Sequence, residues 1–166
     1  ACALYALANE GVWPTDRWRE ALQAWSEEKH LKRSWRYMAP VLTKIPDEVL
    51  QSLRQSLSWW LQTVAKVFED HEPQFFDLSR RILTLDYEPT GDDDPVGRAI
   101  NHPVGHVTEA LLRWWYRRTL EDEQGLPVEI ETCFTELCDT RIEKFRHGRI
   151  LLAAHVIALF RVDTGW

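Results

Sequence analysis

The chain is predicted to be all-helical, and two observations support this fold class. Two tryptophan doublets, Trp59-Trp60 and Trp114-Trp115, each lie late in a long helical stretch that opens with a proline. Apolar residues recur at intervals of three and four, and no stretch alternates cleanly enough to predict a strand. We therefore expect about seven helices in antiparallel pairs, forming either a HEAT-like α-solenoid or an irregular helical bundle.

Proline, glycine and capping residues place the helices of the first half. Residues 1–7 are typical of the end of a helix that closes at Gly11, because glycine accepts the left-handed backbone found there. Pro14 and Pro46 stand where helices begin, since proline suits the first helical position. Pro40 could kink or shorten the second full helix. The predicted helices span 14–28, 30–44 and 46–68.

The second half is predicted to contain a long loop and four helices. Residues 86–101 are rich in aspartate, proline and glycine, which favours an acidic loop. Asn101 or His102 is expected to cap the helix that starts with Pro103. The last helix is almost wholly apolar from Ile150 onward, so we expect protein to surround it at the centre of the fold. The predicted helices span 73–85, 103–120, 128–139 and 141–161.

Composition favours one soluble helical domain over residues 1–166. The net charge of −6 argues against a broadly basic nucleic-acid-binding surface. Three cysteines without a CxxC pair fit reduced thiols and a cytoplasmic location. The longest apolar run is too short to cross a membrane, for which roughly 20 residues are needed. The two ends of the sequence suggest a piece of a larger protein, with a processed chain as the alternative.

The tryptophan doublets predict where a partner would bind. Adjacent residues on a helix point about 100° apart, so both rings of a doublet cannot lie on one apolar stripe. Trp60 and Trp114 follow the stripes of their helices and are predicted to be core residues, with Trp115 at the border. Trp59 shares its side of the helix with polar residues. We therefore predict that Trp59 contacts a partner, together with Arg113 and Arg117 on the other doublet's helix.

An arginine and tryptophan face suggests a nucleic-acid-binding module as an alternative. Arg113, Arg117 and Arg118 are interleaved with Trp114, Trp115 and Tyr116, so guanidinium groups could hold phosphates while the rings stack on bases. The same spacing is typical of a solvated helix face that pairs with acidic residues. Two further basic clusters have this ambiguity: Lys29, Lys32, Arg33 and Arg36, and Arg141, Lys144, Arg146 and Arg149.

A third hypothesis is a metal-dependent enzyme. His102, His106 and Glu109 follow an H-x3-H-x2-E spacing, which places all three on one helical face. Two imidazoles and a carboxylate can supply three ligands of an open zinc site. No glutamate lies between the histidines to act as a base, as it does in HExxH. An ordinary solvated face is the competing interpretation, and no cofactor is predicted.

The segment from Ala99 to Leu112, which reads AINHPVGHVTEALL, resembles helical regions of large bacterial proteins that carry a sirtuin-type domain. The stretch from Ile150 to Trp166 is similar to the same regions. This resemblance implies a sensing or assembly role beside an N-terminal enzyme in phage defence. Nothing in this chain would bind NAD, so no catalytic residue is carried over. We therefore expect a non-enzymatic interaction or regulatory module of a larger bacterial protein, bound to a protein partner or to other domains of its parent chain.

Overall fold

The computed structural model of the protein describes residues 2–89, 91 and 93–166, and within these residues it is all-helical with no strand. Two short 3-10 turns, Glu28–His30 and Glu143–Phe145, precede α3 and α9. The α-helices are α1 (Cys2–Asn9), α2 (Thr15–Trp25), α3 (Leu31–Leu42), α4 (Asp47–Val64), α5 (Glu72–Thr84), α6 (Pro95–Asn101), α7 (Pro103–Tyr116), α8 (Val128–Leu137), α9 (Arg146–Ala154) and α10 (Val156–Val162). The all-helical class is thus confirmed, although the described part holds ten α-helices rather than about seven.

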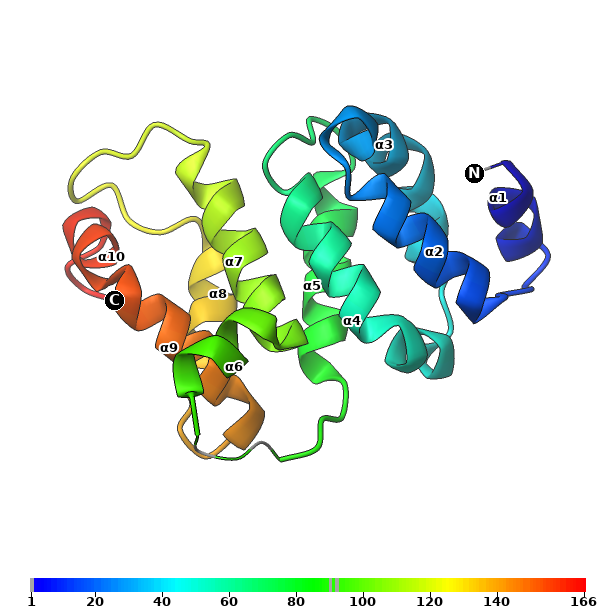
Figure 1. Cartoon of the computed structure of the whole chain (residues 1–166). Helices are drawn as coiled ribbons and strands as arrows, with labels where there is room; N and C mark the ends of the chain where they lie inside the picture. Colours follow the sequence, from blue (N-terminus) through cyan, green and yellow to red (C-terminus); the bar gives the residue numbers. More distant parts are fainter. Residues whose placement is uncertain (1, 90, 92) are drawn as a thin grey trace.

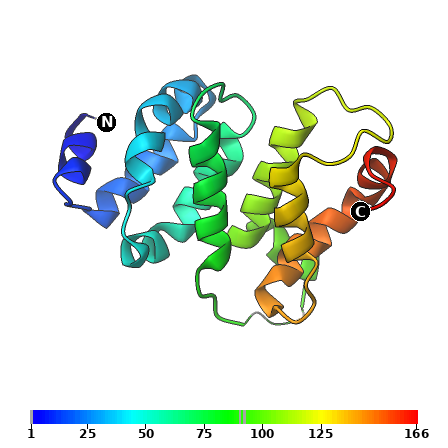
Figure 2. The ribbon, with the colours of Figure 1, turned by 180° about the vertical axis from the view of Figure 1, so that it is seen from behind.

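The helices follow one another along an elongated molecule, with α1 at one end and α10 at the other (Figure 1). Helices α2, α4 and α7 lie on one side, whereas α3, α5 and α8 lie on the other (Figure 2). Contacts run along the first side from α2 to α4 and from α4 to α7, and α5 packs across onto both α4 and α7. The arrangement therefore consists of two layers of helices.

The two tryptophan doublets lie at the centre, because α4 and α7 form the most extensive helix pair of the described residues. Trp60 and Trp114 are buried, as their stripes predict, and Trp115, expected at the border, is fully buried as well. A continuous series of ring contacts, with centroids 4.9–5.6 Å apart, joins the two doublets. Its members, in order of contact, are Trp60, Trp35, Phe68, Phe75, Phe76 and Trp114.

The prediction of one long loop over residues 86–101 is wrong in its second half, where α6 forms. Asp94 caps this helix by accepting a hydrogen bond from the Gly97 amide, and Pro95 occupies the first turn. Helix α6 then meets α7 at His102, whose Nδ1 accepts from the Val104 amide. The two helices approach so closely that a Cβ added to Gly105 would lie 1.7 Å from the Ala99 carbonyl oxygen.

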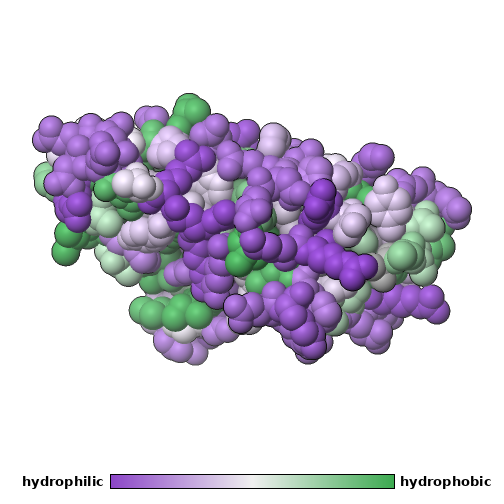
Figure 3. Space-filling view, turned by 90° about the horizontal axis from the view of Figure 1, so that it is seen from above, coloured by the Kyte–Doolittle hydropathy of each residue, from purple (hydrophilic) through white to green (hydrophobic). Residues whose placement is uncertain are grey.

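The prediction of one buried helix over residues 141–161 is also wrong. The segment divides into a 3-10 turn, α9 and α10, and the helix is interrupted at His155. Ile157 is 78% exposed and Phe160 is 64% exposed, so α10 is peripheral rather than central. On the face seen from above, the surface is mostly hydrophilic, with several hydrophobic patches toward the end that carries α10 (Figure 3).

Candidate protein-interaction groove

A surface groove of about 670 Å³ lies between α2 and α4 and contains Trp59. Its formation follows from the doublet: Trp60 turns into the core, so the neighbouring ring must leave it on the side that faces α2. The groove is lined by Asp16, Arg19, Glu20, Gln23, Gln55, Ser56 and Trp59.

The Trp59 side chain is half-exposed, at 47%, yet its orientation is fixed. The edge of its ring system packs against His106 of α7, with centroids 5.3 Å apart and an interplanar angle of 74°. His106 is in turn held by a 3.0 Å hydrogen bond between its Nδ1 and the Ser58 hydroxyl. A large ring that is already positioned loses little conformational freedom when a partner covers it.

The electrostatics of the groove are set by α2. Arg19 pairs with Asp16 at 2.6 Å and donates to the Ser52 hydroxyl of α4, so its charge is engaged within the groove. Glu20 makes no ion pair with any of the described residues. The groove therefore combines one apolar ring with amide groups and an unpaired carboxylate.

Arg113 and Arg117, which the sequence predicts as partner-binding residues, lie apart from this groove. Arg113 donates to the Gln62 carbonyl in the last turn of α4, and Arg117 donates to the Ala65 carbonyl at its C-cap and to the Phe68 carbonyl in the segment that follows. The last carbonyls of a helix have no partner within it, so these guanidinium groups supply the missing donors. Their contacts fasten α7 to α4, and only Trp59 of the three predicted residues lines the groove.

Other basic side chains have similar internal partners. Arg118 lies over the Trp114 ring at 3.8 Å and pairs with Glu72. Arg81 caps the end of α3 through the Thr43 and Ile45 carbonyls, and Arg149 caps the end of α8 through those of Leu137 and Asp139. Because their donors are used inside the fold, these arginines do not form a continuous basic face.

The proposed metal triad is not assembled. Glu109 pairs with Arg113, whereas His102 stacks on His147 of α9 with ring centroids 4.0 Å apart. Among the described residues no group of three His, Cys, Asp or Glu side chains could hold a metal ion. His106, expected on a solvated face, is only 1% exposed.

Burial keeps these histidines neutral. It lowers the pKa of His106 to about 4, with a further contribution from the Arg113 charge and a small opposing one from the Ile100 backbone. It lowers the pKa of His102 to about 3, assisted by His147, His106 and Arg54. Helical spacing does not predict these partners, because Ser58 and His147 lie more than forty residues from the histidines they contact.

Comparisons with known proteins found no relative of this chain. No family model, no curated protein and no solved structure matches the chain. Within the part of the chain that the structure describes, no helix is long and apolar enough to cross a membrane.

Proposed function

We propose that this domain is a non-enzymatic protein-interaction module of a larger bacterial protein, and that it binds a protein segment in the groove between α2 and α4. The observation that carries the proposal is Trp59, a half-exposed ring fixed in a groove while the other members of both doublets are buried. Tryptophan is strongly enriched among the residues that dominate binding energy at protein interfaces.

The groove favours a partner segment with an apolar anchor next to a lysine or arginine. The anchor would cover the Trp59 ring, and the basic group would meet Glu20, whose carboxylate has no ion pair among the described residues. The net charge of −6 also favours encounter with a basic segment. Such a segment could belong to another protein or to another domain of the parent chain.

The resemblance of the Ala99–Leu112 segment to sirtuin-domain-containing bacterial proteins supports a sensing or assembly role in defence as part of this proposal.

The nucleic-acid and metal-enzyme alternatives have less support. Arg113, Arg117 and Arg118 all have partners inside the fold, and His102, His106 and Glu109 point to separate partners.

Selection from a random peptide library tests the groove. We expect the selected peptides to share an apolar residue close to a lysine or arginine. Trp59→Ala should weaken their binding by about 2 kcal/mol, which is roughly thirtyfold. Glu20→Gln should weaken binding less and should reduce its dependence on salt.

Tyr116→Ala provides the matched control, because Tyr116 is an aromatic residue of similar exposure outside the groove. It should leave peptide affinity unchanged. Trp59→Ala should lower the free energy of unfolding by less than about 1 kcal/mol, so that lost binding cannot be attributed to lost folding. Peptides that bind wild type and Trp59→Ala equally would refute the groove as the site.

A further inference from the structure

A second cleft, of about 550 Å³, lies between α1 and α3, next to the C-terminal end of α2. One wall is Tyr5 of α1, and another is Trp25, the last residue of α2. The floor includes Met38 of α3, which is only 2% exposed. The volume is in the range of sites that hold a small organic molecule, roughly 300–1,000 Å³.

The cleft follows from the spacing of residues on α3 and on the turn before it. His30, Arg33 and Tyr37 recur at helical intervals and line the cleft along one side of this segment. Met38, the next residue after Tyr37, lines it from the adjoining buried side of α3. Trp25 is braced from behind by the buried Trp18, in an edge contact with centroids 6.1 Å apart. The Trp25 wall of the cleft is therefore held by the core.

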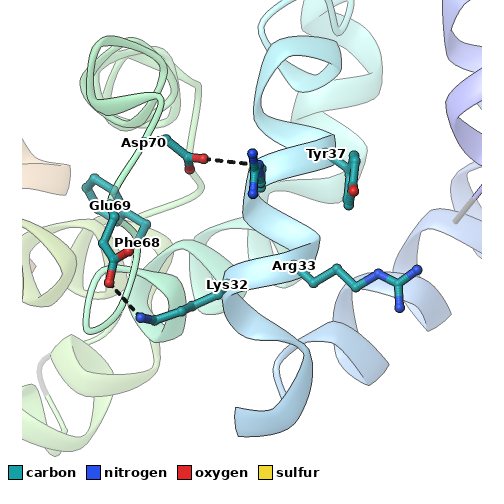
Figure 4. Close-up of a pocket in the computed structure, with 7 residues that line it drawn as sticks. Lys32, Arg33, Tyr37, Phe68, Glu69 and Asp70 are labelled. Carbon is teal, nitrogen blue, oxygen red and sulfur yellow. Dashed lines mark hydrogen bonds and ion pairs between the residues drawn. The ribbon is translucent and has the colours of Figure 1, made fainter.

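Arg33 differs from its basic neighbours on α3. Lys32 pairs with Glu69 at 2.6 Å, and Arg36 pairs with Asp70 at 3.6 Å. Figure 4 shows Arg33 extended away from both acidic residues. No hydrogen bond or ion pair joins Arg33 to any of the described residues, and its side chain lines the cleft. An unpaired guanidinium beside an apolar floor is complementary to an anion that carries an apolar body.

We propose that this cleft binds a small amphipathic carboxylate, with its acyl or aromatic body on Met38 and Trp25 and its carboxylate paired with Arg33. The guanidinium fork can donate two parallel hydrogen bonds to the two carboxylate oxygens. The site is separate from the groove that contains Trp59, because the two share no lining residue.

Isothermal titration calorimetry with decanoate and with decanamide, its neutral analogue, tests the proposal. Decanoate should bind more tightly than decanamide to the wild-type protein. Arg33→Gln should weaken decanoate by about tenfold while leaving decanamide unchanged, since only the charged contact is lost. Arg36→Gln is the matched control, because Arg36 is on the same helix but already has an acidic partner. It should change neither ligand.

Cysteine labelling locates the bound ligand. Cys2 lines the cleft, whereas Cys138 is an exposed thiol outside it, and Cys133 is buried. Decanoate should slow the reaction of Cys2 with a thiol reagent and leave that of Cys138 unchanged. The proposal is overturned if millimolar decanoate does not bind, if decanamide binds as tightly, if Arg33→Gln has no effect, or if Cys2 is not protected.

Discussion

Helix α10 has a more apolar sequence than helix α7, yet it lies in the more exposed environment. Eleven of the fourteen residues of α7 are buried, against two of the seven in α10. Helix α7 has α4 and α5 on one side and α6 and α9 on the other. Helix α10 lies at the end of the molecule (Figure 1). Burial therefore depends on the number of neighbouring helices, and an apolar composition alone does not reveal it.

Truncation of an equivalent side chain in each helix is the strongest test of this contrast. Leu111→Ala in α7 should lower the free energy of unfolding by about 2–5 kcal/mol, because it opens a cavity in a fully buried position. Ile157→Ala in α10 should change it by less than about 0.5 kcal/mol. Urea denaturation of both variants measures the difference. Equal losses would show that α10 is packed in solution.

The buried histidines around α7 make its stability depend on pH. The unfolded chain binds protons at His106 near pH 6.5, whereas the folded chain does so only near pH 4. Unfolding therefore takes up protons between these values, and stability falls as the pH is lowered. The free energy of unfolding should drop by up to roughly 3 kcal/mol from pH 7 to pH 4 for this residue. His106→Gln should flatten that slope, and an unchanged slope in the variant would contradict the assignment.

Truncation of the arginines near the end of α7 should give the smallest change in the free energy of unfolding. Arg117→Ala removes donors from the Ala65 carbonyl at the end of α4 and from the Phe68 carbonyl just after it, and should cost about 1–2 kcal/mol of stability. Arg118→Ala removes an exposed ion pair and a ring contact, and should cost less than about 1 kcal/mol. Thermal unfolding of the two variants ranks them. The reverse order would assign the stabilisation to the surface contact.

The sequence predicts which side of its helix each tryptophan occupies, but it does not predict which distant segments pack against a given helix. The stripes of Trp60 and Trp114 and the exposure of Trp59 follow from helical periodicity, which needs no knowledge of neighbouring helices. Helix α6 was missed although Asp94 and Pro95 are a capping residue and a first-turn proline, because the acidic and glycine-rich composition favoured a loop. The burial of His106 and the exposure of Ile157 depend on contacts between distant segments, which periodicity does not encode.

Gly105 limits how this domain can vary. The Ala99 carbonyl occupies the space that any side chain at this position would need, and Leu151 of α9 lies 3.3 Å from the same point. A larger residue would displace α6, which also packs on α9. In functional descendants of this sequence, position 105 should therefore remain glycine.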